Sequence, residues 1–117
     1  MEERRSYNRV PSRLIVFLTL AQTGRVIRVL TNDISGAGIR CTSNEPLPPG
    51  TPLHVEVQLP DGGVPIRLTA QVVWSRTIEE SRSRWGVQYE VGIGIVEIAP
   101  KDRAIILHYA RLATPES

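Results

Sequence analysis

The sequence predicts a mainly β fold, an antiparallel barrel or sandwich of short strands followed by one C-terminal helix. Between residues 14 and 98, apolar runs recur about every 8–12 residues, and turns rich in glycine, proline and asparagine separate them. No helical periodicity interrupts these runs before residue 100. Short strands with tight connections usually pair with their neighbours in the chain, which favours an antiparallel sheet.

The first half of the chain contains three expected strands, at residues 14–20, 25–30 and 38–42. The connection at residues 22–24 holds a glycine, and the connection at residues 32–36 holds asparagine, aspartate, serine and glycine. Glycine tolerates positive backbone angles, and these polar side chains bond to their own backbone. We therefore expect turns at both connections.

The second half contains three more expected strands, at residues 53–59, 64–74 and 89–98. Residues 53–59 alternate strictly between apolar and polar, which is typical of a strand with one buried face. The connections are polar or rich in proline and glycine, at residues 46–52, 60–63 and 75–84. We expect these three segments to be loops or hairpin connections.

The last element is a helix, expected over residues 100–113. Pro100 suits a first helical position, and Asp102 complements the positive end of the helix dipole. Ile105, Tyr109 and Leu112 recur at helical spacing, as do Ile106 and Ala110, so one face of the helix can pack on the strands.

The 117 residues suit one domain with a polar segment before it. Residues 1–13 are charged and cannot bury themselves, so we expect an N-terminal arm. Residues 14–113 are expected to form the domain, with strands over 14–98 and the helix over 100–113. Residues 114–117 are expected to form a tail.

Composition excludes several classes of protein. Hydrophobic residues make up 41% and charged residues 22%, which argues against a disordered chain. The longest apolar run, residues 14–20, is too short to cross a bilayer, and no secretory signal follows Met1. The one cysteine, Cys41, cannot form an internal disulfide, and with two histidines it cannot build a zinc site. We expect a cytoplasmic protein without membrane insertion, metal or cofactor.

The basic residues are almost all arginine, since Lys101 is the only lysine. Arginine pairs bidentately with phosphates and base edges, although codon usage explains this bias equally well. The net charge of +2 argues against a wide surface for duplex DNA or RNA. Aromatic residues at 5% argue against a barrel that stacks single-stranded nucleic acid, so we expect no nucleic-acid partner.

Two short motifs carry polar chemistry. The first is a basic cluster in the arm, Arg4, Arg5 and Arg9, which by itself is typical of a solvated tail. The second is Asp-x-Ser-x-x-Gly, formed by Asp33, Ser35 and Gly38. It has a structural explanation as a turn, yet about one or two in a hundred sequences of this composition would contain it by chance.

Together the two motifs suit one ligand class, a guanine nucleotide. The Watson–Crick edge of guanine presents two adjacent donors, which the carboxylate of Asp33 can accept. Its other edge presents O6 and N7, which an arginine fork meets bidentately. Ser35 and a second arginine remain for phosphate oxygens. A P-loop is absent, so these features predict binding of the nucleotide without hydrolysis.

The order of these motifs resembles the PilZ domain, a bacterial receptor module for cyclic di-GMP. Arg-Arg-x-x-x-Arg at residues 4–9 precedes a strand pair and then Asp-x-Ser-x-x-Gly at residues 33–38. Residues 70–74 resemble the family's fifth strand, and residues 92–98 resemble its Gly-φ-x-Phe-φ-Asp/Glu-φ strand, with Ile95 in place of Phe. The resemblance implies a six-stranded antiparallel β-barrel of the split-barrel kind, a flexible arm before it and a C-terminal helix.

The resemblance also implies which residues bind cyclic di-GMP: Arg4, Arg5, Arg9, Asp33, Ser35 and Gly38. In the family's pattern Arg5 and Arg9 grip guanine and phosphate, and Arg4 assists. Asp33 and Ser35 contact the second face of the dinucleotide, and the glycine allows its close approach.

No group of residues resembles a catalytic site, so we expect no enzymatic activity. His54 lies on the polar side of an alternating strand and His108 in the expected helix, and neither has a nucleophile or paired acid nearby in sequence. Cys41 is expected to be a small buried hydrophobic residue. Trp74 and Trp85 could act as stacking platforms, but we expect them to pack the barrel. Arg40 could point into the same site, but we expect it to face solvent.

The expected function is that of a receptor whose arm folds over cyclic di-GMP and which signals through an unidentified partner protein. The alternative is a PilZ-like protein-interaction module that does not bind nucleotide. The intact motifs favour the receptor, and a homodimer is left open.

Overall fold

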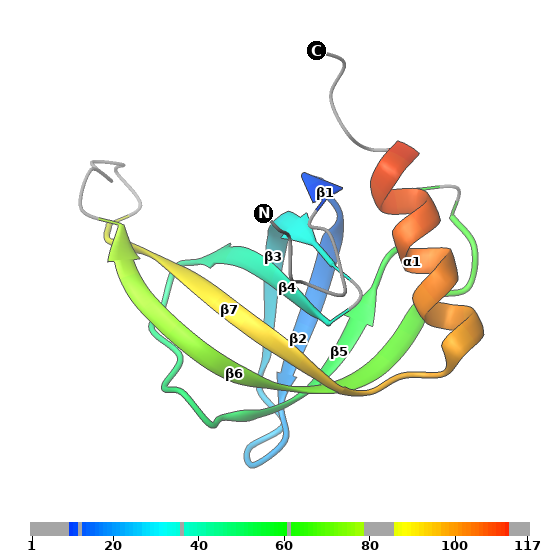
Figure 1. The fold of residues 1–117 in the computed structure, drawn as a ribbon. Helices are drawn as coiled ribbons and strands as arrows, with labels where there is room; N and C mark the ends of the chain where they lie inside the picture. The colour runs from blue at the N-terminus through cyan, green and yellow to red at the C-terminus, as the bar shows by residue number, and fades with distance from the viewer. Residues whose placement is uncertain (1–9, 12, 36, 61, 79–85, 113–117) are drawn as a thin grey trace, which may run out of the picture.

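The computed structural model describes residues 10–11, 13–35, 37–60, 62–78 and 86–112, and it contains seven strands and one helix (Figure 1). The elements are β1 (Val10–Pro11), β2 (Ile15–Leu20), β3 (Val26–Ile34), β4 (Gly38–Ser43), β5 (Pro52–Val57), β6 (Ile66–Ile78), β7 (Gln88–Glu97) and α1 (Pro100–Leu112). Arg4, Arg5, Arg9 and the tail at residues 114–117 lie outside the described residues.

Six of the strands form a closed antiparallel barrel. The strands follow the order β3-β2-β5-β6-β7-β4, and the pairing of β3 with β4 closes the ring. The short β1 pairs with the end of β3, Val10 with Ile34 and Pro11 with Asp33, beyond the point where β2 stops. The predicted six-stranded barrel with a C-terminal helix is therefore confirmed, and the last residues of the arm lie against β3.

A register shift in β3 decides which residues face outward at its end. Val29 belongs to the buried core before the shift, and Ile34 belongs to it afterwards, so the inward-facing positions change from odd to even numbers. The shift lies between Thr31 and Asp33, where β3 pairs with β4. A bulge of this kind re-aims the following side chains. Asp33 consequently points to the outer face of the barrel.

The turn expected at residues 32–36 was wrong in its first part, because residues 32–34 continue β3. Asparagine and aspartate favour turns locally, but cross-strand pairing with β1 and β4 holds this segment extended. The chain turns only after Ile34, where the Ser35 amide donates to the Gly38 carbonyl at 2.8 Å.

The connection expected at residues 75–84 was also wrong at its start, because β6 continues to Ile78. Residues 75–78 pair with residues 88–91 of β7. Residues 75–78 are all at least partly exposed, so their polar side chains are compatible with a strand. Figure 1 shows β6 and β7 as the long curved strands on one side of the barrel.

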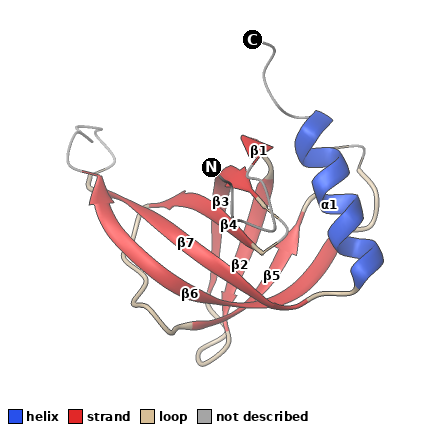
Figure 2. Ribbon diagram, in the orientation of Figure 1, coloured by secondary structure: helices blue, strands red, loops and turns tan. Residues whose placement is uncertain are grey.

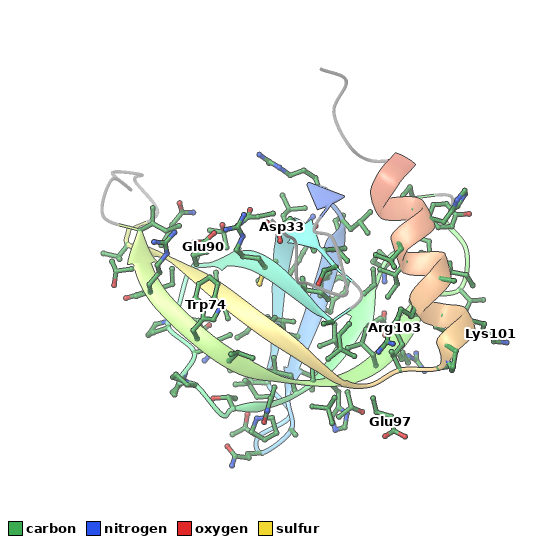
Figure 3. All side chains as sticks on the ribbon, in the orientation of Figure 1. Asp33, Trp74, Glu90, Glu97, Lys101 and Arg103 are labelled. Atoms are coloured by element: carbon green, nitrogen blue, oxygen red, sulfur yellow. The ribbon has the colours of Figure 1, made fainter. Side chains whose placement is uncertain are left out.

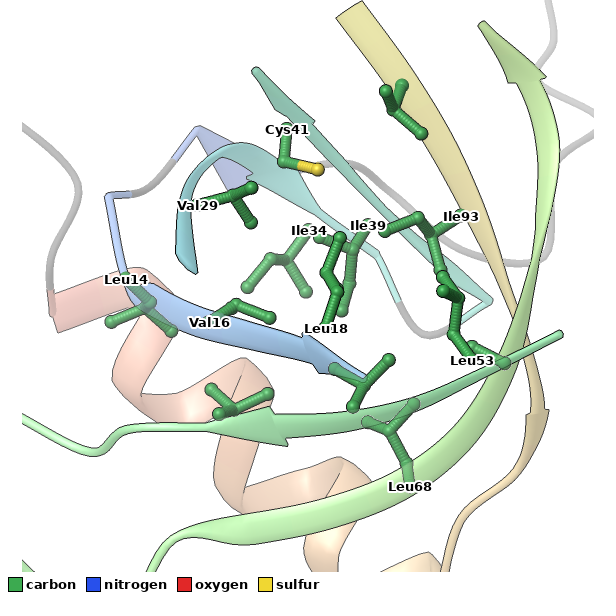
Figure 4. Close-up of a cluster of buried hydrophobic side chains, with 14 of the residues drawn as sticks. Leu14, Val16, Leu18, Val29, Ile34, Ile39, Cys41, Leu53, Leu68 and Ile93 are labelled. Carbon is green, nitrogen blue, oxygen red and sulfur yellow. The ribbon is translucent and has the colours of Figure 1, made fainter. Parts of the chain in front are cut away.

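The core fills the interior of the barrel with aliphatic side chains (Figure 4). Its largest fully buried members are Leu18, Ile34, Ile39, Leu53, Val16, Val55, Val57, Val72 and Val91. Each of these residues comes from a strand of the ring, and strands that alternate inward and outward positions produce such a core.

The helix α1 contacts β1 and β3, and Figure 2 shows it at one side of the barrel. Its inner face contributes Ile106, which is 3% exposed, and Ile105 and Leu107 pack partly against the core. This confirms the amphipathic face predicted from the helical spacing. Within the described ranges, no helix combines the length and the apolar character that a bilayer crossing requires.

Cys41 provides a test of how closely the barrel is packed. The side chain is fully buried, and burial together with the nearby charge of Glu90 raises the pKa of the thiol from 9.0 to about 12. We expect the folded protein to react slowly with a thiol reagent such as DTNB at neutral pH and to react rapidly in urea. Equal rates in the two conditions would contradict the packing described.

The same shift has a consequence at high pH. The unfolded chain loses the Cys41 proton at a lower pH than the folded chain does, so the free energy of unfolding should fall as pH rises from about 9 towards 12. The variant Cys41→Val should reduce this fall in chemical denaturation measurements.

Candidate functional site

Four charged side chains cross the outer face of the barrel in a line, which we call the charged row. Its members lie on neighbouring strands, Asp33 on β3, Arg40 on β4, Glu90 on β7 and Arg76 on β6. Arg40 pairs with Asp33 through Nη2, and its Nε lies 3.3 Å from Glu90 Oε2. Arg76 donates to Glu90 Oε1 from Nε at 2.9 Å and from Nη2 at 2.6 Å. The charges alternate along the row and balance.

The carboxylates of the charged row are buried, and its arginines are not. Asp33 is 4% exposed and Glu90 is 9% exposed, whereas the side chains of Arg40 and Arg76 are 38% and 70% exposed. A buried carboxylate requires compensating charges or hydrogen bonds, and the guanidinium groups supply them. The acids therefore have fixed positions, while the arginines have room to change theirs.

The serine of the second motif shapes the turn after β3. Ser35 Oγ accepts hydrogen bonds from the backbone amides of Ala37 and Gly38, both at 3.2 Å. A serine that bonds to the amides two and three residues ahead stabilises a tight turn. This turn joins β3 to β4 and brings Gly38 next to Gly94 of β7.

An apolar shelf lies beside the charged row. It surrounds a cavity of about 160 Å³ lined by Ala37, Gly38, Val73, Trp74, Gly92, Ile93 and Gly94. The indole of Trp74 covers Gly92, where a Cβ atom would overlap the ring, and a Cβ at Gly94 would lie 2.9 Å from Val73. The two glycines thus leave space that the outward side chains of β6 occupy.

Trp74, expected to pack the barrel, packs on its outer face over Gly92 and not in the core. Trp74 is 37% exposed, and Figure 3 shows it on the same side of the barrel as Glu90. The cause is a register irregularity between Val72 and Trp74 in the pairing of β6 with β7. Val72 belongs to the core, but Val73 and Trp74 are both exposed.

Three of the six residues predicted to bind the ligand lie in the described part of the chain, and the fold brings them together. Asp33 and Ser35 flank Ile34 at the end of β3, and Gly38 begins β4 after the same turn. The three arginines of the arm are outside the described residues. The next residue after the last of them, Val10, pairs with Ile34.

Sequence reasoning missed Glu90, and it favoured a solvent-facing Arg40 over an Arg40 that points into the site. Arg40 does point outward, as expected, but its guanidinium pairs with the buried carboxylate of Asp33. Glu90 was detectable in principle, because it shares the outward parity of a strand with Gly92 and Gly94. Because the two glycines have no side chains, a side chain from a neighbouring strand can approach the acid on this outer face.

A larger cavity, of about 600 Å³, lies at a distance from this site along β5, β6 and the start of α1. His54, Glu56, Arg67, Glu97 and Asp102 are among its lining residues, and none of the predicted ligand residues is. In the part of the chain described, no group of three or more His, Cys, Asp or Glu could hold a metal ion. Among the described residues, those predicted to bind the ligand lie at the charged row and the turn beside it.

The sequence model of the PilZ domain family matches residues 3–111. The chain belongs to the PilZ domain family. This confirms the resemblance found in its motifs, and it covers both the arginine motif and the Asp-x-Ser-x-x-Gly motif of this PilZ domain. A search of curated proteins finds no match.

Solved structures share the fold of this PilZ domain. The Bacillus subtilis inhibitor of motility MotI is 25% identical, with a TM-score of 0.75 over 93% of this chain and 50% of its own. The PilZ domain of Escherichia coli YcgR, solved with c-di-GMP, is 16% identical, with a TM-score of 0.66 over 95% of this chain and 89% of its own. Borreliella burgdorferi PlzA in complex with c-di-GMP is 10% identical, with a TM-score of 0.61 over 90% of this chain and 49% of its own. The chain thus spans about half the length of MotI and PlzA.

The contact between Trp74 and Gly92 gives a direct test of the shelf. In a Trp85→Phe background, which leaves one indole, Gly92→Ala should displace the ring and shift its fluorescence emission. Overpacking of this kind costs about 1–3 kcal/mol, so the free energy of unfolding should also fall. Val96→Ala, an exposed position on the same strand, should change neither quantity. Identical emission in Gly92→Ala and its parent would contradict the contact.

Proposed function

We propose that this PilZ domain is a receptor for cyclic di-GMP, with the dinucleotide bound on the outer face of the barrel at Asp33. The observation that carries the proposal is the pairing of β1 with the end of β3. It supports a site in which the arginine motif and the Asp-x-Ser-x-x-Gly motif act on one ligand. YcgR and PlzA, which share the fold, have been solved with c-di-GMP, and this supports the choice of ligand.

The reach of the arm is sufficient for this assignment. Arg9 precedes Val10, and consecutive Cα atoms are about 3.8 Å apart. Val10 in turn pairs with Ile34, and paired strands lie about 4.8 Å apart. Arg5 lies five residues before Val10, a separation of at most about 18 Å in an extended chain. Both side chains can therefore reach Asp33 and Ser35 without unpairing β1.

The chemistry of each group suits a guanine nucleotide. The Asp33 carboxylate accepts from the N1–H and N2–H₂ donors of guanine, and an arginine fork donates to O6 and N7. Arg5 and Arg9 take these donor roles towards base and phosphate, and Arg4 assists. Ser35 and Gly38 hold the turn that lets the ligand approach the backbone. The cavity beside them is small, so the dinucleotide lies on an open surface.

Trp74 extends the proposed site, because it lines the same cavity as Ala37 and Gly38. Its ring is partly exposed and is fixed over Gly92, so one face is available to a base. An aromatic ring and a base stack through offset π faces, with affinity that depends little on which base is present. Trp74 accordingly adds affinity, whereas Asp33 and the arginines select guanine.

In this proposal the protein is a signalling receptor without enzymatic activity. Closure of the arm over the ligand alters the surface that a partner protein meets, and charge-assisted contacts offset the entropy lost in ordering the arm. The PilZ-like interaction module that binds no nucleotide is the second candidate. One observation favours it, since Asp33 already has a partner in Arg40.

Titration calorimetry with cyclic di-GMP tests the proposed function. We expect binding to the wild-type protein and no binding to Asp33→Asn or Arg9→Ala, with folding of each variant verified by circular dichroism. Arg67→Ala is the matched control, because Arg67 is an exposed arginine of β6 that pairs with Glu56 away from the site. Absence of heat with the wild-type protein would support the interaction module instead.

A further inference from the structure

The carboxylate that is proposed to bind guanine is already engaged in the described structure. Asp33 and Arg40 are directly opposed in the pairing of β3 with β4, and Arg40 Nη2 contacts Asp33 Oδ2. Guanine needs the acceptor positions of this carboxylate for its own donors. A ligand that pairs with both oxygens of Asp33 therefore shares Oδ2 with Arg40 or displaces Arg40 from it.

A second carboxylate lies on the other side of Arg40. Glu90 accepts both hydrogen bonds from Arg76 on Oε1, while its Oε2 faces Arg40 Nε at 3.3 Å. The Arg40 Nε atom is buried but makes no hydrogen bond with a protein atom at this distance and angle. Glu90 Oε2 can therefore accept a closer hydrogen bond from Arg40 than the present contact at 3.3 Å.

We propose that Arg40 competes with the ligand for the carboxylate of Asp33. When guanine binds Asp33, Arg40 moves to Glu90. The inference rests on the proposed function, and it names Arg40 and Glu90 as positioning residues of that site. In the unliganded protein Arg40 neutralises the buried Asp33. In the complex the guanine donors satisfy Asp33, and Arg40 rotates to Glu90 Oε2.

The surroundings of Arg40 permit this exchange. Arg40 lies directly opposite Gly92 in the pairing of β4 with β7, and Glu90 is two residues before Gly92 on the same strand. The indole of Trp74 occupies the space over Gly92, but Arg40 Nε already lies 3.3 Å from Glu90 Oε2, so the exchange needs no large movement. The side chain of Arg40 is 38% exposed, which leaves it room to rotate. Arg40 keeps a carboxylate partner throughout the exchange, and the two guanine donors take its place on Asp33, so neither group is left without hydrogen bonds.

Two other roles for Arg40 predict different results. If Arg40 binds a phosphate of the ligand, its removal weakens binding. If it only stabilises the fold, its removal lowers the melting temperature and leaves the affinity unchanged. The competitor role predicts that removal of Arg40 strengthens binding and that removal of the Glu90 charge weakens it.

The experiment is a double-mutant cycle of Arg40→Met and Glu90→Gln, with the affinity for cyclic di-GMP measured by titration calorimetry. Contacting charged groups couple strongly, so we expect Arg40→Met to tighten binding roughly tenfold and Glu90→Gln to weaken it roughly tenfold. In the double variant Glu90→Gln should have no effect of its own, because no arginine needs to be received. Arg40→Met should also lower the melting temperature of the unliganded protein.

Matched controls come from the exposed ion pair of Arg67 and Glu56. Substitutions there remove the same two charges elsewhere on the barrel. Arg67→Met and Glu56→Gln should leave the affinity unchanged. Weaker binding in Arg40→Met, or the same loss from Glu90→Gln with and without Arg40, overturns the inference while the proposed function stands. Failure of the wild-type protein to bind cyclic di-GMP overturns both.

Discussion

The burial of one carboxylate on the outside of the barrel is the constraint on which the site depends. Asp33 would face the interior if β3 kept its register, and the shift after Thr31 turns it outward while Ile34 returns to the core. Pairing with β1 on one side and β4 on the other then covers it. A buried carboxylate in such a place needs donors, and both a resident arginine and a guanine base can supply them.

The charged row shows how the barrel supports that carboxylate. Four neighbouring strands each contribute one charge, so the position of each group depends on the pairing of the whole sheet. Buried ion pairs are weak sources of net stability, but loss of one partner is costly because it leaves the other charge unpaired. A row with one extra carboxylate oxygen at Glu90 can exchange partners without such a loss. This connects the electrostatics of the free protein to ligand binding.

Much of the fold could be predicted from the sequence, because local patterns determine it. The strict alternation of residues 53–59 indicates a strand, and the helical spacing after Pro100 indicates a helix. Residues 32–34 were misjudged because their types favour turns, whereas pairing with distant strands keeps them extended. The outward position of Trp74 depends on a register shift between β6 and β7. The contact of Glu90 with Arg40 depends on the pairing of β7 with another strand, β4. Neither can be read from a local sequence pattern.

The central claim is that Asp33 accepts the Watson–Crick donors of guanine. NMR of ¹⁵N-labelled cyclic di-GMP bound to the unlabelled protein observes these donors directly. We expect an imino proton that is protected from exchange with water and has cross-peaks to protons of residues 33–35. Imino protons that exchange as fast in the complex as in the free dinucleotide would contradict the claim.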